Sequence, residues 1–144
     1  MSGYRLPAGG RIDRSRAIAF TFDRRGYRGF EGDSLASALV ASGVTLFGRS
    51  FKYHRPRGLL AAGVEEPNAL VTVTRGTGRT TPNLRAPSVP LHGGLVAESQ
   101  NRYPSLGFDL GAINDRLGAF FPAGFYNKTF MWPRWSLFEP SIRK

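Results

Sequence analysis

One short helical segment, with strand-like segments on both sides of it in the sequence, limits what this chain can fold into. Asp33 is predicted to be its N-cap, because a carboxylate there accepts hydrogen bonds from the first turn and suits the helix dipole. Gly43 suits the left-handed position that ends a helix. Between them, three apolar residues share one face: Leu35, Leu39 and Val40. A helix with a single apolar face has to pack against a sheet or another helix.

Before this helix, the sequence predicts a β-hairpin. Apolar and small or polar residues alternate over 18–22, which is typical of a half-buried strand. Residues 23–26 form a turn signal in which Gly26 suits a positive φ, and residues 27–30 would return as the second strand.

After the helix, further short strands are predicted at 44–47, 70–74 and 95–97, with Val71 and Val73 the candidates for burial in the second of them. The resulting order is strand, strand, helix and then further strands. It predicts an α+β fold of the β-grasp type, a small mixed sheet with one helix packed across it.

The predicted domain organisation has three parts. Residues 1–16 are rich in Gly, Pro and Arg and predict an irregular basic arm, residues 17–98 form the β-grasp domain, and residues 99–144 form an aromatic-rich extension with a short helical piece at 114–117. Eight of the chain's eighteen aromatic residues lie between Phe120 and Phe138. This segment either folds back on the sheet or packs on another domain or subunit. We favour the second, since the sheet already has a helix to cover it.

Composition excludes several kinds of chemistry. The chain has no Cys, so it supplies no disulfide and no thiolate, whether for catalysis or for iron–sulfur ligation. Its two histidines, His54 and His92, have no spacing typical of a zinc site. Glu65 and Glu66 are adjacent and would point to opposite sides of an extended chain. No nucleotide-binding glycine motif and no membrane span occurs, and without an export signal the cytoplasm is the expected compartment.

The net charge of +10, with 17 of the 20 cationic residues being Arg, predicts an anionic partner. Five basic residues and interleaved aromatic rings gather in the hairpin-like segment 49–57: Arg49, Lys52, His54, Arg55 and Arg57. They are candidates for binding a nucleic-acid strand, for holding a flavin or nucleotide phosphate, or for tying down a loop or a partner's carboxylates. The residues alone leave these alternatives open.

Several long strings of the sequence resemble a known family. GDSLASALVASGV, GRSFKYHRPRG, EEPNALV, SQNRYPSLGFD and PAGFYNKTFMWP closely resemble the N-terminal region of the alpha subunits of heterotetrameric sarcosine oxidases, over nearly the whole chain from Arg5. That region is similar to the [2Fe–2S] ferredoxin-like domains of amine, opine and hydroxyproline dehydrogenases.

Cluster-bearing relatives have a Cys-x4-Cys-x2-Cys loop and a later fourth Cys. The resemblance places these ligand positions at Ala61, Glu66, Ala69 and Pro87. Since none of them is a thiolate, we expect no cluster and no metal on this chain, and a loop kept for its shape.

The resemblance implies a structural and docking segment of a flavin-dependent oxidase, without catalytic residues of its own. The whole complex would oxidise sarcosine to glycine, with tetrahydrofolate as one-carbon acceptor and hydrogen peroxide as product. It would carry FAD, FMN and NAD, with zinc in a small subunit. A dinucleotide-binding domain would follow this segment, whether the chain is a fragment or a separate subunit. Two alternatives remain open: a small subunit of another flavin dehydrogenase acting on an amine, an opine or hydroxyproline, and a basic nucleic-acid-binding domain, which the resemblance disfavours.

Overall fold

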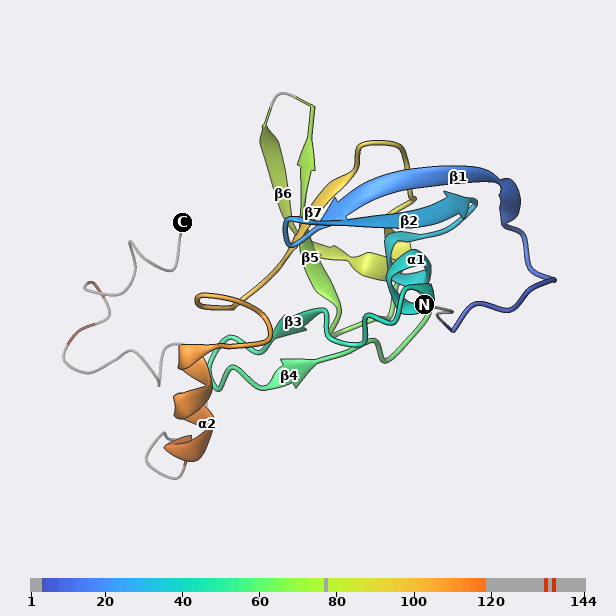
Figure 1. Cartoon of the computed structure of the whole chain (residues 1–144). Helices are drawn as coiled ribbons and strands as arrows, with labels where there is room; N and C mark the ends of the chain where they lie inside the picture. Colours follow the sequence, from blue (N-terminus) through green and yellow to red (C-terminus); the bar gives the residue numbers. More distant parts are fainter. Residues whose placement is uncertain (1–3, 77, 119–133, 135, 137–144) are drawn as a thin grey trace.

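The computed structural model describes residues 4–76 and 78–118, together with Arg134 and Ser136. A five-stranded mixed sheet with the strand order β2-β1-β7-β5-β6 forms its body (Figure 1). The strands are β1 (Asp13–Phe22), β2 (Arg25–Glu31), β5 (Leu70–Arg75), β6 (Arg79–Arg85) and β7 (Val96–Ser99). β1 and β7 run parallel, and every other neighbouring pair is antiparallel. This arrangement confirms the predicted α+β fold of the β-grasp type.

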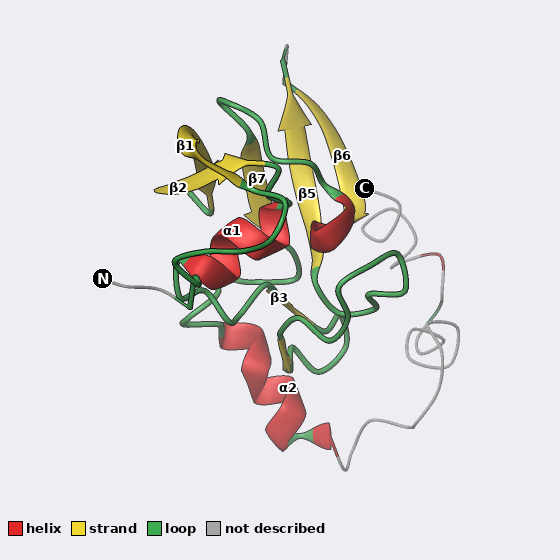
Figure 2. Cartoon of the chain, turned by 90° about the vertical axis from the view of Figure 1, so that its right-hand side faces the viewer, coloured by secondary structure: helices red, strands yellow, loops and turns green. Residues whose placement is uncertain are grey.

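Helix α1 (Leu35–Ala41) lies across one face of the sheet (Figure 2). The core lies between helix and sheet, and its largest buried members are Phe20, Phe22, Leu35, Leu39, Phe47, Val71, Val73 and Leu95. The burial of Val71 and Val73 confirms the alternation predicted for that strand. Because one face of each element carries the apolar residues, a two-layer packing buries them all at once.

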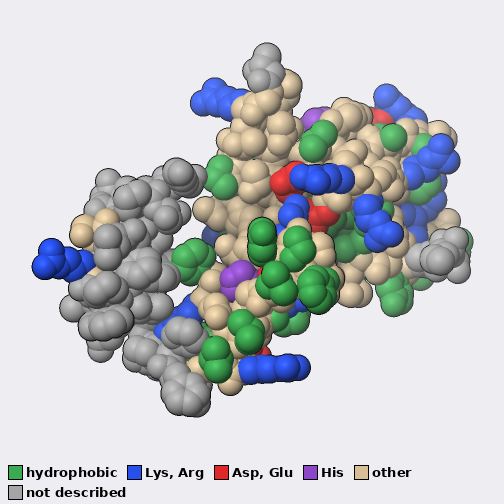
Figure 3. Space-filling model, turned by 60° about the vertical axis from the view of Figure 1, so that its left-hand side comes forward, with side chains coloured by type: hydrophobic (Ala, Val, Ile, Leu, Met, Phe, Trp, Pro, Cys, Tyr) green, Lys and Arg blue, Asp and Glu red, His purple; other side chains and the backbone are tan. Residues whose placement is uncertain are grey.

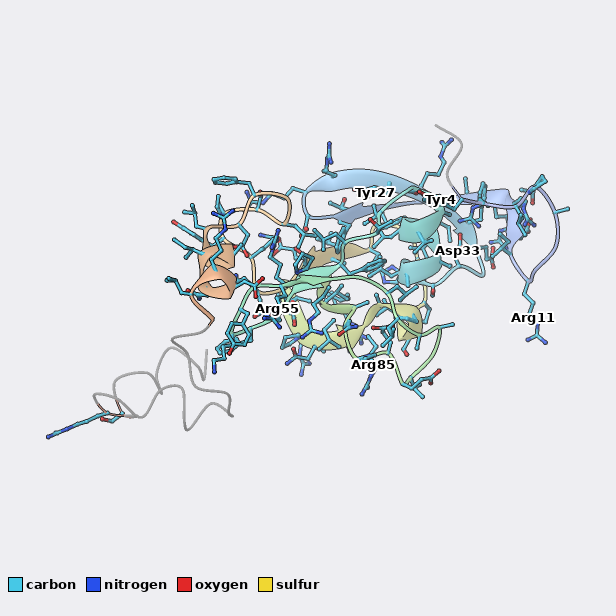
Figure 4. All side chains as sticks on the ribbon, turned by 90° about the horizontal axis from the view of Figure 1, so that it is seen from below. Tyr4, Arg11, Tyr27, Asp33, Arg55 and Arg85 are labelled. Carbon is cyan, nitrogen blue, oxygen red and sulfur yellow. The ribbon has the colours of Figure 1, made fainter. Side chains whose placement is uncertain are left out.

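The start of α1 differs from the prediction by one residue. Ser34, not Asp33, is the N-cap, and Ser34 and Ser37 form a reciprocal capping box. Asp33 lies just before the helix, buried, and its carboxylate accepts from Ser37 Oγ at 2.7 Å and from Arg5 at 2.7 Å. Figure 4 shows Asp33 at this end of α1. Gly43 has the predicted left-handed φ of 86° and ends the helix.

Several strand boundaries were predicted inaccurately. β1 begins at Asp13, so it extends into the segment assigned to an irregular arm. In the turn after β1, the positive φ angles belong to Asp23 and Arg24 and not to Gly26. Residues 44–47 form no strand. The prediction also missed β6, whose proline is tolerated because the strand lies at the edge of the sheet.

The remaining elements lie beside the sheet. β3 (Gly48–Arg49) and β4 (Pro56–Arg57) pair antiparallel, which confirms the hairpin character of the basic segment. A 3-10 turn, η1 (Ala86–Ser88), follows β6, and a second, η2 (Leu110–Ala112), leads into α2 (Ile113–Arg116) where a helical piece was predicted. None of the described helices is long and apolar enough to cross a membrane. The aromatic segment 120–138 lies outside the described residues except for Arg134 and Ser136.

Candidate functional site

The side chain of Glu66 fills the interior of the loop 60–69, which joins β4 to β5. Glu66 is fully buried. Its Oε2 accepts from the backbone N–H groups of Leu60 at 2.7 Å and Ala61 at 2.5 Å, and its Oε1 from those of Asn68 at 2.7 Å and Ala69 at 2.9 Å. Two donors on each oxygen satisfy the carboxylate without any cation. The loop is therefore closed on itself around one negative charge.

These donors determine the protonation state of Glu66. Burial raises the pKa of the carboxyl, but the hydrogen bonds from the backbone of Ala61, Ala69, Asn68 and Leu60 lower it by more, and the net direction is below the ordinary value of 4.5. Glu66 is therefore an anion at neutral pH, and its N–H partners stabilise that form.

The four positions that the resemblance assigns to cluster ligands lie around this loop: Ala61, Glu66, Ala69 and Pro87. The backbone N–H of Ala86, the residue before the fourth position, donates to the carbonyl of Ala69 at 2.9 Å. Arg85 Nε donates to the carbonyl of Glu66 at 3.2 Å. Arg85 is labelled in Figure 4. These two hydrogen bonds hold the residues just before the fourth position, Pro87, against the loop.

The residues at these positions do not fit a [2Fe–2S] cluster. Such a cluster needs four soft ligands, normally thiolates. Two positions carry a methyl group and one a pyrrolidine ring, and the chain has no Cys anywhere. The single carboxylate is already held by four N–H groups. In the part of the chain that the structure describes, no three His, Asp or Glu side chains are grouped to hold a metal ion.

A second buried carboxylate, Asp109, ties the segment before α2 to the basic hairpin. Its Oδ2 lies 2.7 Å from Nδ1 of His54 and 3.3 Å from Nε of Arg49. Its Oδ1 accepts from the backbone N–H groups of Tyr103 at 2.8 Å and Gly111 at 3.2 Å. Asp109 is therefore held through Oδ2 by side chains of the hairpin and through Oδ1 by backbone N–H groups of its own segment.

Arg49 strengthens the same tie. It donates through Nε and one terminal nitrogen to the carbonyl of Leu106, at 3.1 and 3.0 Å, and through the other to the carbonyl of His54 at 2.8 Å. Its side chain is only 10% exposed. The planar fork of a guanidinium suits this task, because it reaches several oxygens at fixed angles.

The pKa of Asp109 is shifted in the same direction as that of Glu66. Burial raises its pKa, but the hydrogen bonds from the backbone of Tyr103, from His54 and from the backbone of Gly111 lower it by more, so the pKa lies below the ordinary 3.8. Because an ionised carboxylate has no proton to give, Nδ1 of His54 carries the proton in this contact. The left-handed backbone of His54, with φ 52°, directs the ring towards Asp109.

The other basic residues of the hairpin lie nearer the surface. Arg55 pairs with Asp115 of α2 at 2.6 Å and lies over the ring of Tyr53, and Figure 4 shows it beside α2. Arg57 donates to the side chain of Asn68 at 2.7 Å. Lys52 lies 5.2 Å from the ring centre of Tyr53. The structure therefore brings the five predicted residues together on one hairpin, with Arg49 and His54 turned towards Asp109.

Sequence reasoning missed Asp109 and the role of Glu66. The one available signal for Asp109 was its position two residues before a glycine, at the start of a helical piece, which is typical of a capping residue. Nothing in the sequence pairs it with His54, because 55 residues separate them. For Glu66, one of two adjacent acids in a loop of small residues, nothing in the sequence indicated which of the two is buried.

An exposed apolar surface adjoins this site. It consists of five side chains between the end of β7 and the end of α2, each between 42 and 68% exposed: Tyr103, Phe108, Leu110, Ile113 and Leu117. We name it the 103–117 surface. Figure 3 shows hydrophobic side chains gathered beside a histidine on the face turned to the viewer. Apolar residues at this density on a segment held in place by Asp109 are typical of a surface that contacts another protein.

The chain matches one protein-family model and is similar to sarcosine oxidase alpha subunits. The family model described as "2Fe-2S iron-sulfur cluster binding domain" matches residues 15–102. The chain is 61% identical over its whole length to the sarcosine oxidase subunit alpha of Rhizobium meliloti (strain 1021), but spans only 15% of that relative. It is 50% identical to the sarcosine oxidase subunit alpha of Corynebacterium sp. (strain P-1), over 50% of this chain and 8% of the relative.

Among solved structures, an L-proline dehydrogenase from P. horikoshii aligns with 63% of this chain and 17% of its own, at a TM-score of 0.48 and 24% identity. That resemblance is too distant to carry an argument. The family match covers more than half of the chain, and the β-grasp topology agrees with it. Although it has no cysteine ligand, the chain therefore belongs to the family of 2Fe-2S iron-sulfur cluster binding domains.

Proposed function

We propose that the chain is a structural and docking segment of an alpha subunit of the heterotetrameric sarcosine oxidase type. The observation that carries the proposal is the exposed 103–117 surface. The chain is 61% identical over its whole length to such a subunit and spans 15% of that subunit. The remaining part of a similar subunit would supply the polypeptide that covers this surface. The alternative of a basic nucleic-acid-binding domain loses support, since Arg49 and His54 are engaged with the buried Asp109.

The packing beneath the 103–117 surface supports docking. Asp109 and Arg49 hold the backbone of this segment by hydrogen bonds at Tyr103, Leu106 and Gly111. A surface that is already ordered loses little conformational entropy when a partner covers it, so more of the apolar burial appears as affinity. Each exposed ring or aliphatic side chain adds roughly 1.5–3 kcal/mol when fully buried.

The same proposal includes the organisation predicted from the sequence. The β-grasp domain predicted at 17–98, which begins at Asp13 in the structure, would carry no cluster; the residues before it would be an arm, and residues 99–144 would be a docking extension that leads into a dinucleotide-binding domain. Oxidation of sarcosine, with FAD, FMN, NAD and tetrahydrofolate, would be carried out by the other parts of the complex. The chain itself would contribute positions and surfaces and no reacting group.

The basic hairpin is proposed to face a flavin, its phosphate or an acidic patch of a partner. A groove of about 810 Å³ lies beside it, and its lining includes Arg49, Phe51, Arg57 and Gln100. Arg49 and His54 would act there indirectly, because both are committed to Asp109. Arg55, Arg57 and Lys52 would make the direct contacts, with guanidinium forks suited to phosphate or carboxylate oxygens.

Substitution of the 103–117 surface tests the docking proposal. Ile113→Asp and Leu117→Asp are introduced into the protein expressed with its neighbouring coding sequence, and Val64→Asp, an exposed residue outside this surface, is the control. We expect the first two to lower co-purification of the other subunits and the sarcosine-dependent production of hydrogen peroxide. Full assembly of both variants would refute the proposed docking surface. Activity on another amine, an opine or hydroxyproline, without activity on sarcosine, would refute the substrate.

Charge reversal tests the proposal for the hairpin. Arg55→Glu and Arg57→Glu are compared with Arg28→Glu, an exposed residue of β2. If the hairpin faces a flavin or an acidic partner, the first two lower flavin content or assembly and the third leaves both unchanged. Unchanged flavin content and assembly in all three variants would count against it.

A further inference from the structure

The four N–H groups around Glu66 form a geometry that requires an anion. They come from two short stretches, 60–61 and 68–69, and each stretch donates to one of the two carboxylate oxygens. Among the described residues, no side-chain cation reaches either oxygen. The partial positive charges of four aligned amides therefore converge on one position, as they do in the backbone nests that bind small anions.

Among the described residues, none of these four N–H groups donates to a backbone carbonyl. Residues 60–68 belong to no strand or helix, so the sheet offers these N–H groups no carbonyl. Glu65, the neighbouring acid, is exposed, while Glu66 is fully buried. If the side chain of Glu66 were removed, up to four backbone donors would lose their acceptor, each at a cost in free energy.

We propose that residues 60–69 form a carboxylate-binding site whose resident ligand is the side chain of Glu66. This side chain stands at one of the family's cluster-ligand positions, where the chain's residues do not fit a cluster. The carboxylate supplies the negative charge that the inward N–H groups need, and it keeps the loop folded without a cofactor. When the side chain is shortened, the site accepts a free small carboxylate such as formate.

Chemical rescue distinguishes a binding site from an ordinary buried glutamate. Glu66→Ala and the control Glu65→Ala are prepared in the protein with its accompanying subunits, and hydrogen–deuterium exchange is followed by mass spectrometry in peptides that cover 60–69. We expect Glu66→Ala to exchange roughly tenfold or more faster than the unmodified protein at these amides. Formate should restore their protection saturably, whereas chloride at the same ionic strength should not.

Three outcomes would overturn the proposal. They are normal protection in Glu66→Ala, rescue by chloride as efficiently as by formate, and no rescue by formate in a Glu66→Ala protein that is otherwise folded. Glu65→Ala should behave like the unmodified protein with and without formate.

Two further variants keep the proposal testable if Glu66→Ala does not fold. Glu66→Gln keeps the shape but turns an amide NH2 towards one pair of N–H donors, and Glu66→Asp is one methylene too short to reach both pairs. We expect Glu66→Gln to lose protection at one stretch, 60–61 or 68–69, more than at the other. Equal protection of both stretches in Glu66→Gln and in the unmodified protein would show that charge at this position has no role, and would overturn the proposal.

Discussion

Glu66 and Asp109 are both fully buried carboxylates with lowered pKa values, yet they stabilise the chain in different ways. Glu66 is held by backbone N–H groups that lie no more than six residues away along the chain. Asp109 is held by His54 and Arg49, which lie 55 and 60 residues away, in addition to its own local N–H groups. The first closes a loop, and the second joins two distant segments.

The difference shows how partners determine what a buried charge contributes. Backbone donors remain whatever their side chains are, so the hydrogen bonds of the Glu66 carboxylate depend on one side chain only. The Asp109 contact depends on three side chains, and removal of any one leaves the remaining buried groups with fewer partners. Substitutions around Asp109 should therefore be strongly coupled, whereas substitutions around Glu66 should not.

The largest expected effect comes from Asp109→Ala. It removes the acceptor of His54 Nδ1 and the ion-pair partner of Arg49, and it frees the N–H groups of Tyr103 and Gly111, so we expect a loss of about 3–5 kcal/mol in the free energy of unfolding. Urea denaturation measures it. The control is Asp115→Ala, which removes an exposed partner and should cost at most about 1 kcal/mol. A loss below that of the control would contradict the assigned role of Asp109.

Gly111→Ala tests the same contact from its other side. A Cβ at this position would overlap the imidazole ring of His54, which cannot move without leaving Asp109. We expect a loss of about 1–3 kcal/mol, the usual range for overpacking. Gly107→Ala, where a Cβ meets nothing within 4 Å, is the matched control.

The double variant His54→Ala with Gly111→Ala sharpens this test. Once the ring is absent, the three atoms that an added methyl group would overlap most are gone, so the double variant should be no less stable than His54→Ala alone. Additive losses would show that the two residues do not compete for the same space.

Acid should weaken both contacts, and the two carboxylates can be separated by substitution. A lowered pKa in the folded state means that each contribution is complete above the ordinary pKa, 4.5 for Glu66 and 3.8 for Asp109, and is lost as the pH falls through the lowered value. A pKa lowered by one unit corresponds to about 1.4 kcal/mol in the free energy of unfolding.

The measurement is the urea midpoint between pH 7 and pH 3, for the unmodified protein, Glu66→Gln and Asp109→Asn. Each variant should lose less stability on acidification than the unmodified protein, because one of the carboxyl groups with a lowered pKa is absent; Asp33 and Asp13, whose pKa values are also lowered, titrate alike in all three proteins. An identical pH dependence in all three proteins would mean that neither carboxylate is stabilised by its surroundings.

The smallest expected effect is that of the Arg55–Asp115 pair, whose side chains are 58 and 46% exposed. Arg55→Ala should change the free energy of unfolding by at most about 1 kcal/mol, and less at high salt, because water and ions screen the pair. Urea denaturation at two salt concentrations checks this. A large, salt-independent loss would place Arg55 with the buried residues around Asp109.

Much of the fold was predictable because it follows from local patterns. The alternation around Val71 and the left-handed end of α1 at Gly43 are both written in neighbouring residues. The missed β6 shows the limit, since Pro82 argues against a strand unless the strand lies at an edge, and only the sheet order decides that. The N-cap lies one residue later than predicted, because Ser34 forms a capping box with Ser37. Asp33 lies before the helix, and its carboxylate accepts a hydrogen bond from Ser37 Oγ.

By itself, the sequence determined the α+β class, the basic hairpin at 49–57 and the absence of cysteine ligands at the family's cluster positions, because residue types and short spacings carry these properties. Only the tertiary structure decided that the Glu66 carboxylate turns into its own loop and that His54 and Arg49 meet Asp109. Such contacts depend on where the folded backbone directs N–H groups and side chains that are far apart in the chain, and no short-range pattern encodes that.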